Sequence, residues 1–435
     1  MTDISTSTLT SGLGELIRSK RIDKQMTLPQ ASELSGIPEE MLSRIESGES
    51  TAPEFRSMLA LATTLNIPIE EMTETYIELE RSSESLFTVL KEAIPRLLPI
   101  PLIMKIATQL LTISQRETSE DSVERLYALA TETQEIPRKL ALFKVISQFT
   151  DDHSIRPTLA KSLLQSYLIE RGDLRRLGDS YEYGRSIQYH VKFLPVDDQI
   201  VYYYKIGVHA YHLGKYEDCI QHCKKVLTLD YSEGTTKAEA LLLSASSYFL
   251  LGLFDSAEKY VRLLKAFNFP WLNDQVDFLQ AKIDSKKISN ELAIVQIEKF
   301  LDKHPHKVVV MYDLLDLYLK QNDVNAIERL IKHEKDFIDF TSTNHPLLIS
   351  EHAVYFSKKS EYYFTINNAK EGFHNLFKSI IMFISVDRHR EASSNIGMLL
   401  SVMSRFPSAL HSFEKEFHQV IEYLQNNNNK GGAFI

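Results

Sequence analysis

Along nearly the whole chain, apolar residues recur at every third or fourth position, with polar residues between them. This spacing is typical of amphipathic helices. Glycine (15) and proline (14) are few for 435 residues, which disfavours sandwiches, barrels and doubly wound sheets. The pattern therefore predicts an all-α protein. Because 435 residues exceed what one core usually spans, we expect two domains or a repeat array.

Residues 13–72 are expected to form short helices separated by residues that start or stop a helix. Thr27 is a candidate N-cap, Gly36 allows a sharp turn, and Pro38 opens the next helix. Leu42 and Ile45 supply the buried side of that helix. This succession is the spacing of a helix-turn-helix.

The same residues resemble the DNA-binding domain of phage repressors, the XRE (Cro/CI-like) family. Ala31 stands where that family usually has a larger aliphatic residue, and Pro38 replaces the usual hydroxyl cap of the recognition helix. The resemblance implies that residues 38–44 enter the major groove of double-stranded operator DNA. It is carried, in order, by residues 13–18, 26–28, 33–37, 42–48 and 65–68.

The candidate DNA contacts follow from this placement. Arg44 would read O6 and N7 of guanine, and Glu39 and Glu40 would accept from cytosine N4; the alternative is that Arg44 is solvated or paired within its helix. From residue 13 to 65, six basic residues stand against eight acidic ones, so a monomer should hold phosphate weakly and a homodimer on two half-sites is expected. The full predicted set is Arg18, Arg21, Lys24, Thr27, Pro38, Glu39, Glu40, Ser43 and Arg44.

A recurring unit occupies residues 99–424. Its clearest copy, residues 203–230, has the small residue Gly207, a turn at Gly214 and an aromatic at Tyr216, and it resembles a tetratricopeptide repeat. Stacked hairpins of this kind predict a right-handed tetratricopeptide-like superhelix with a concave groove. Further copies are expected at residues 245–264, 279–305 and 312–327, with weaker ones around 172–173 and 367–369.

The remaining segments are assigned by exclusion. Residues 1–12 are expected to be a flexible N-terminus, residues 73–98 a helical linker, and residues 425–435 a disordered tail. The repeat domain at residues 99–424 is then the part expected to sense a peptide.

The first helix of each repeat would present aromatic anchors and a few polar groups to the groove. This mixture suits an extended peptide, whose side chains need pockets and whose backbone needs donors and acceptors. The alternative is that these aromatic residues pack between helices. The predicted peptide contacts are Tyr204, Tyr211, His212, Leu242, Ser246, Phe249, Phe278, Lys282, Lys286, Tyr312, Asp316 and Lys320.

Five possible metal ligands lie within fifteen residues: His209, His212, Cys219, His222 and Cys223. In the repeat register the two cysteines point inward, whereas His212 points to the groove, so we expect core packing and no metal. Two cysteines at this spacing exclude a disulfide framework and fit a reducing cytoplasm.

Several functional classes are disfavoured. The N-terminus is polar and lacks the features of a signal peptide, and the apolar stretches are too short to span a bilayer, so we expect a cytoplasmic protein without membrane contact. A net charge of −9 argues against nonspecific nucleic-acid binding by the whole chain. No phosphate-binding loop, nucleophile elbow or zinc-protease motif is present, so we expect neither an enzyme nor a cofactor.

In architecture the whole chain resembles the RNPP (Rgg/PlcR/PrgX-like) family of quorum-sensing receptors. The resemblance implies a cytoplasmic homodimeric transcription regulator that dimerises largely through its repeat domain, residues 99–424. It also implies that the protein binds a short signalling peptide in these repeats and couples this to operator binding. Two alternatives remain open: a phage or mobile-element repressor controlled by a protein antirepressor, and a tetratricopeptide scaffold without a direct DNA role.

Overall fold

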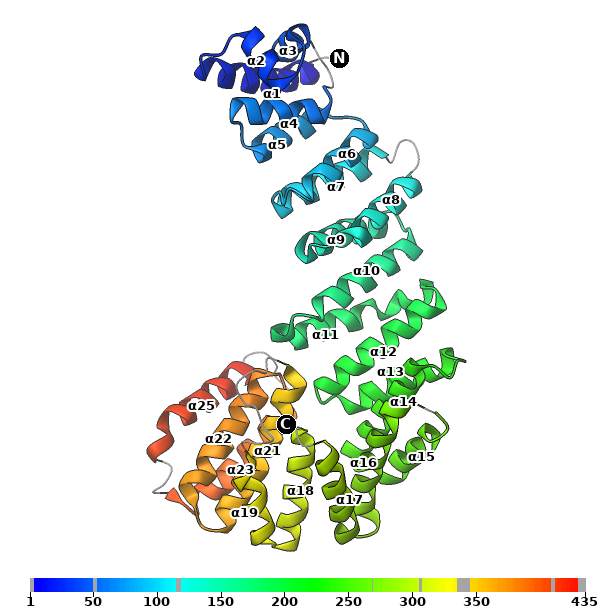
Figure 1. Cartoon of the computed structure of the whole chain (residues 1–435), viewed down its shortest axis with the longest axis vertical. Coiled ribbons are helices and arrows are strands. Elements are labelled where there is room, and N and C mark those ends of the chain that lie inside the picture. Colours follow the sequence, from blue (N-terminus) through cyan, green and yellow to red (C-terminus); the bar gives the residue numbers. More distant parts are fainter. Residues whose placement is uncertain are drawn as a thin grey trace. The chain divides into compact units, whose positions relative to one another are not determined.

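The computed structural model describes residues 4–49, 53–114, 119–267, 269–304, 307–334, 345–407 and 411–428. All regular structure in these ranges is helical, which confirms the predicted all-α class, with tetratricopeptide-like hairpins after the N-terminal domain (Figure 1). The chain divides into two compact units: an N-terminal unit of Met1–Ile169 with Tyr189–Leu194, and a C-terminal unit of Glu170–Gln188 with Pro195–Ile435.

The N-terminal unit begins with the helix-turn-helix domain, formed by α1 to α5. Residues 4–12, expected to be flexible, already belong to α1, while residues 1–3 lie outside the described residues. The helices of this unit are α1 (Ile4–Asp23), α2 (Leu28–Ser35), α3 (Glu39–Glu46), α4 (Phe55–Leu65), α5 (Ile69–Leu79), α6 (Ser83–Ala93), α7 (Ile100–Ser114), α8 (Ser119–Glu132), α9 (Ile136–Asp152) and α10 (Arg156–Glu170).

Local chemistry sets the turn between α2 and α3. Thr27 caps α2 through a capping box, in which its hydroxyl accepts from the Gln30 amide and the Gln30 side chain accepts from the Thr27 amide. Gly36 ends α2 with φ of 73°, a left-handed conformation that glycine adopts without steric cost. Pro38 precedes α3 and provides no side-chain cap. The sequence signals for these boundaries are therefore confirmed.

The recognition helix α3 is held against α1 by a close approach. Leu42 and Ile45 are buried on its inner side. A Cβ atom on Gly14 of α1 would lie only 2.6 Å from the carbonyl oxygen of Ile45 and 2.8 Å from that of Glu46. Only glycine therefore lets the end of α3 come this near to α1.

The segment at residues 73–98 is not one linker. Helix α5 continues to Leu79 and belongs to the helix-turn-helix domain, because the hydroxyl of buried Tyr76 lies 3.0 Å from the carbonyl oxygen of Pro53. A new helix, α6, starts after Ser82, whose hydroxyl accepts from the Ser85 amide, and α6 packs on α7. The break between the two falls at residues 80–82.

The C-terminal unit is a series of helical hairpins. The predicted repeats coincide with α12–α13, α14–α15, α16–α17, α18–α19 and α21–α22. Its helices are α11 (Leu177–Ser186), α12 (Val196–His212), α13 (Tyr216–Leu229), α14 (Thr235–Leu250), α15 (Phe254–Leu264), α16 (Pro270–Lys287), α17 (Asn290–Lys303), α18 (Val308–Gln321), α19 (Val324–Lys332), α21 (Pro346–Thr365), α22 (Ala369–Ser385), α23 (His389–Met403) and α25 (Glu414–Asn428).

Helix α25 includes residues 425–428, which the sequence assigned to a disordered tail. Residues 429–435, the rest of that predicted tail, lie outside the described residues.

Packing within the hairpins follows the repeat pattern. A Cβ atom on Gly207 would lie 3.3 Å from Sγ of Cys223, so this small residue lets α12 and α13 approach. Cys219 and Cys223 are both fully buried, as expected for core residues. Five turns between consecutive helices of this unit contain a left-handed residue, namely Gly214, Gly252, Asn322, Asn367 and Asp387, whereas the turn between α16 and α17 does not.

The C-terminal hairpins return to contact the first ones of the same unit (Figure 1). Arg388, which precedes α23 and is 6% exposed, donates to the carbonyl oxygen of His212 at 3.2 Å and to the hydroxyl of Tyr216 at 2.7 Å. It also pairs with Glu391. The unit is therefore closed by contacts between segments more than 170 residues apart.

Within the described ranges, no helix combines the length and the apolar character needed to cross a bilayer.

Replacing Gly14 by alanine should destabilise the helix-turn-helix domain by about 1–3 kcal/mol, because its Cβ would press on the backbone of α3. Gly12→Ala is the matched control on the same helix, since nothing lies within 4 Å of its Cβ, and it should stabilise by about 0.5–1 kcal/mol. Hydrogen exchange of the α3 amides in the full chain measures the stability change in both variants. Equal protection in the two variants would contradict the packing described for Gly14.

Candidate DNA-reading surface and ligand pocket

The outer face of α3 is open to solvent. Glu39, Glu40, Ser43 and Arg44 are exposed, as is Pro38 in front of them, so the predicted reading residues share one accessible surface. Leu42 and Ile45 anchor the opposite face. The helix therefore presents short polar side chains and one arginine, the type of residue set that contacts base edges in a major groove.

Arg21 is not available for DNA in this structure. Its guanidinium forms two 2.7 Å bonds to the Glu46 carboxylate and donates to the Met26 carbonyl oxygen at 2.8 Å. The side chains of Arg21 and Glu46 are 13% and 7% exposed. Arg21 therefore ties α1 to α3 and positions the recognition helix, and its predicted contact with DNA stays a prediction.

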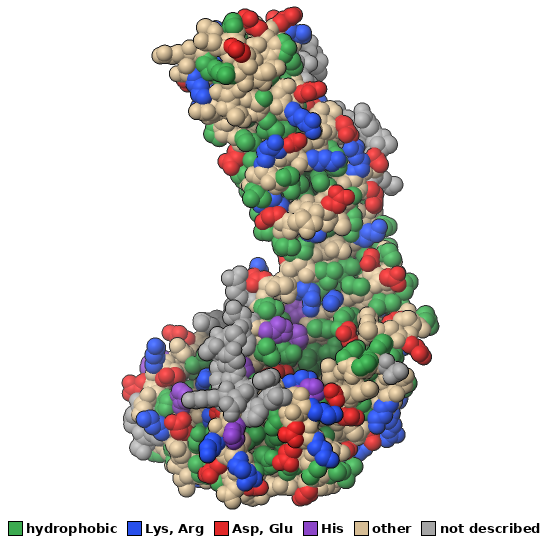
Figure 2. All heavy atoms as spheres, viewed as in Figure 1, with side chains coloured by type: hydrophobic (Ala, Val, Ile, Leu, Met, Phe, Trp, Pro, Cys, Tyr) green, Lys and Arg blue, Asp and Glu red, His purple; other side chains and the backbone are tan. Residues whose placement is uncertain are grey.

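The other predicted DNA contacts outside α3 differ in their exposure and in the hydrogen bonds that they form within the protein. Arg18 is exposed. Lys24 is exposed but donates to the Thr64 carbonyl oxygen at 2.9 Å. Thr27 is occupied as the cap of α2. The part of this domain visible in Figure 2 shows few basic side chains, in keeping with six basic and eight acidic residues between 13 and 65.

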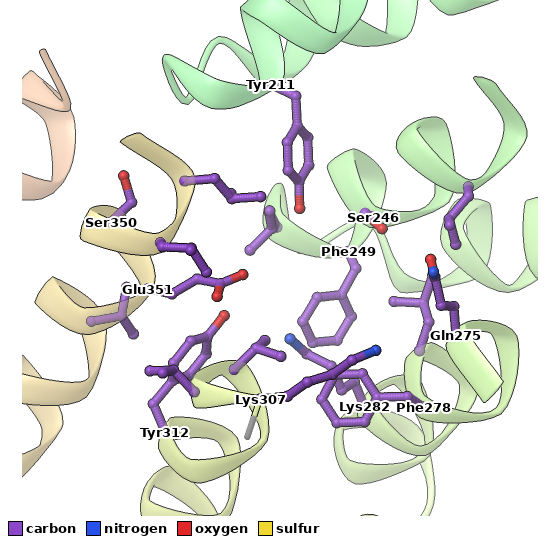
Figure 3. Close-up of a pocket in the computed structure, with 18 of the residues that line it drawn as sticks. Tyr211, Ser246, Phe249, Gln275, Phe278, Lys282, Lys307, Tyr312, Ser350 and Glu351 are labelled. Atoms are coloured by element: carbon purple, nitrogen blue, oxygen red, sulfur yellow. The ribbon is translucent and has the colours of Figure 1, made fainter. Parts of the chain in front are cut away.

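A cavity of about 480 Å³ lies inside the C-terminal unit, within the 300–1,000 Å³ usual for ligand pockets (Figure 3). Its walls come from α12, α13, α14, α16, α17, α18 and α21, and from Arg388. Apolar side chains are prominent on the hollowed face of this unit in Figure 2. The cavity exists because the returning helix α21 covers one side of it.

Most of the predicted groove residues gather here. A second pocket of about 180 Å³ adjoins the cavity and shares Phe249, Lys282 and Tyr312 with it. Lys286 and Asp316 line this second pocket. The predicted residues that line the main cavity are Tyr211, Leu242, Ser246, Phe249, Phe278, Lys282 and Tyr312.

Three predicted groove residues line neither pocket. Tyr204 bonds to Glu239 of α14, and burial raises the pKa of its hydroxyl. His212 contacts His345 ring to ring at 5.8 Å, and burial, reinforced by His345, lowers its pKa to about 4. Lys320 pairs with Asp316 on its own helix. These side chains support the surrounding structure.

A buried ion pair organises the floor of the cavity. Nζ of Lys282 lies 2.8 Å from Oδ2 of Asp313, and the two side chains are 12% and 17% exposed. The same ammonium lies 5.1 Å from the ring centre of Phe249, 5.5 Å from that of Phe278 and 5.7 Å from that of Tyr312. Lys282 thereby holds three aromatic walls together.

Lysines surround Asp316 in the adjoining pocket. Its carboxylate lies 3.1 Å from Nζ of Lys358 and 3.9 Å from that of Lys286. Burial alone would raise the pKa of Asp316, but Lys358 and Lys320 bring it below its ordinary value. Burial, followed by the neighbouring Lys320, lowers the pKa of Lys286 to about 8.

Glu351 faces the main cavity from α21, where Figure 3 shows its carboxylate directed inward. Burial raises its pKa to about 7, although the charges of Lys282 and Lys307 oppose this rise. A carboxylate in a largely apolar wall without a close cation is the arrangement that produces such a shift.

The sequence prediction missed the side of the pocket contributed by α21 and by Arg388. The residues missed lie between 143 and 184 residues after Tyr204, the first predicted contact: Leu347, Ser350, Glu351 and Arg388. No local pattern indicates that α21 folds back over the earlier hairpins. A repeat register on α21, whose copy was recognised only weakly around residues 367–369, is the one signal that would have placed them.

The histidines near the two cysteines, His209 and His222, are buried in the protein core. His209 bonds to the Leu177 carbonyl oxygen at 2.9 Å, and burial lowers its pKa to about 4. Burial also lowers the pKa of His222 to about 4. Across the described part of the chain, no three His, Cys, Asp or Glu side chains are grouped as a metal site would require.

Residues 17–72 match the family model described as helix-turn-helix. The chain therefore carries an N-terminal helix-turn-helix DNA-binding domain, as its XRE-like motif predicted. The match leaves the rest of the chain unassigned. No curated protein matches the chain in sequence.

Three solved structures show similar helical folds. One is a signal transduction ATPase with numerous domains and a tetratricopeptide repeat sensor, from Pyrococcus horikoshii (16% identity, TM-score 0.42, covering 92% of this chain and 66% of that one). Another is PlcR from Bacillus thuringiensis in complex with the peptide PapR7 and DNA (15% identity, TM-score 0.23, covering 89% of this chain and 99% of that one). The third is Naa15/Naa10 bound to HypK-THB (12% identity, TM-score 0.33, covering 96% of this chain and 76% of that one). All three TM-scores are below 0.5, so none bears on what this chain does.

Lys282→Met should destabilise the C-terminal unit by about 3 kcal/mol, because it leaves the Asp313 carboxylate buried without its cation. Adding Asp313→Leu should recover most of the loss. Lys259→Met, at an exposed position on α15, is the control and should change stability by less than about 0.5 kcal/mol. Urea unfolding followed by the fluorescence of Trp271, the one tryptophan of the chain, reports on this unit. Equal losses in the single and double variants would contradict the pairing.

Proposed function

We propose that this chain is a transcription regulator whose helix-turn-helix domain binds operator DNA and whose C-terminal unit binds a short signalling peptide that alters this binding. The observation that carries the proposal is the ligand-sized cavity in the repeat unit of a chain that begins with a DNA-binding domain. The cavity walls combine aromatic anchors with a few polar groups, which suits a peptide.

DNA binding in this proposal depends on the exposed face of α3. Arg44 reads a guanine, while Glu39, Glu40 and Ser43 contact neighbouring positions and Pro38 sets the entry of the helix. With Arg21 withdrawn into the Glu46 pair, fewer basic residues remain to hold phosphate. A homodimer that occupies two half-sites compensates for the weak binding of each monomer.

The peptide acts through the two sides of the cavity. One side is formed by the hairpins α12 to α18 and the other by α21, so a ligand that contacts both favours one spacing between them. In a homodimer this spacing changes how two recognition helices match half-sites about 34–36 Å apart. By linkage, operator DNA changes the affinity for peptide by the same factor.

Arg44→Ala should weaken binding to the preferred operator by about 1–3 kcal/mol and relax the base preference at one position of each half-site. The operator is first obtained by selecting bound duplexes from a random pool with the full chain. Fluorescence anisotropy then gives the affinities. Arg262→Ala, which removes an exposed arginine of α15, is the control and should have no effect. Unchanged affinity and preference in Arg44→Ala would contradict the assigned role of Arg44.

Ser246→Phe should abolish the effect of peptide on DNA binding, because Ser246 lines the cavity and a ring at this position takes up part of the space that the peptide needs. Peptides retained by the purified full chain are released by denaturation, identified by mass spectrometry and synthesised. Adding one back should change operator affinity by about 5- to 150-fold in the wild type and not in the variant. Ser401→Phe, on an exposed face of α23, should behave as the wild type.

Two outcomes would contradict the peptide model. The first is a chain that retains no peptide and whose operator affinity is independent of the peptides supplied. The second is copurification of a protein partner that alone changes operator affinity, which would favour an antirepressor.

A further inference from the structure

The charges that line the main cavity are not all balanced. Of its four charged side chains, Lys282 pairs with Asp313 and Arg388 pairs with Glu391. Glu351 is the one acidic residue in the lining, and no ion pair or hydrogen bond to its carboxylate is found among the described residues. The fourth, Lys307, lies 5.3 Å from the ring centre of Phe300.

Two phenolic hydroxyls face the cavity beside this carboxylate. Figure 3 shows the Glu351 carboxylate between the hydroxyls of Tyr211 and Tyr312, which extend from α12 and α18. Burial raises the pKa of both phenols, and the charge of Glu351 contributes to each rise. Both tyrosines therefore stay neutral, and their oxygens remain available as acceptors.

We infer that this end of the pocket binds a primary ammonium group of the ligand, with Glu351 as its counter-ion. An ammonium carries three N–H donors, and one carboxylate with two phenolic oxygens supplies three acceptors. Phe249 and Leu242 line the same cavity and would hold the apolar part next to the ammonium. The inference rests on the proposed peptide-binding function and adds the polarity of the ligand.

The free-energy cost of burying the Glu351 carboxylate supports this assignment. A carboxylate withdrawn from water without a cation is unfavourable, and an ammonium ligand would remove that penalty on binding. The burial that raises the pKa of Glu351 to about 7 is one sign of the penalty. A guanidinium fits less well, because its planar fork matches a single carboxylate better than three acceptors on separate helices.

The ammonium has two sources in a peptide: the free N-terminus and a lysine side chain. Three synthetic mixtures of random hexapeptides separate them. The first has free N-termini and lacks Lys and Arg, the second is the same mixture N-acetylated, and the third is N-acetylated with one Lys per peptide. Each is incubated with the full chain, and retained peptide is quantified by mass spectrometry after gel filtration.

The wild type should retain the first or the third mixture at least tenfold more than the second. Preference for the first assigns the N-terminus, and preference for the third assigns lysine. Glu351→Gln should remove the preference while keeping the baseline retention of the second mixture. Glu217→Gln, an exposed glutamate of α13, is the matched control and should keep the preference.

Equal retention of the three mixtures by the wild type would overturn the inference and leave the peptide proposal intact, as would a preference that persists in Glu351→Gln. Retention of none of them would instead count against peptide binding itself. The wild-type comparison does not depend on the variant being folded. The melting temperature of Glu351→Gln, expected to equal or exceed that of the wild type because an unpaired charge is removed, verifies its fold.

Discussion

The C-terminal unit depends on the buried guanidinium of Arg388. This group bridges the end of α12 and the start of α13 to the segment before α23, and Glu391 balances its charge. Burying a charged group costs free energy unless its donors are satisfied, and Nη1 and Nη2 of Arg388 have acceptors, whereas its Nε has none among the described residues. These contacts join the two ends of the row of hairpins, in which α21 lies opposite α14 and α16 across a partly open cavity.

A similar arginine shapes the DNA-binding domain. Arg21 lies in the stretch of basic residues that suggests phosphate contacts, yet its guanidinium is consumed by Glu46 and the Met26 carbonyl. Glu46 ends the recognition helix, so the pair orients α3 relative to α1, with Gly14 allowing the two helices to meet. In the proposed function, specificity then depends on a rigidly placed α3, because little basic charge remains for nonspecific binding.

The pocket combines satisfied and unsatisfied charges in a small volume. Lys282 and Asp313 neutralise each other and fix the aromatic walls, whereas Glu351 faces the cavity without a cation. The Lys282–Asp313 pair contributes to folding, whereas in the proposed function Glu351 is the counter-ion of the ligand. A raised carboxyl pKa in a cleft is a common sign of such a site.

Local interactions explain what the sequence alone determined. Helical spacing, the Thr27 cap, the Gly36 turn and the Gly207–Cys223 packing arise between residues close in the chain, so the helix-turn-helix, the hairpins and the groove-facing side of α12 to α18 were predictable. The ion pair between Arg21 and Glu46 was not predicted, because the two residues lie 25 positions apart. Only tertiary structure places Glu351 and Arg388 in the cavity wall, because α21 packs on α18 and Arg388 bonds to residues more than 170 positions earlier, and no local pattern encodes either contact.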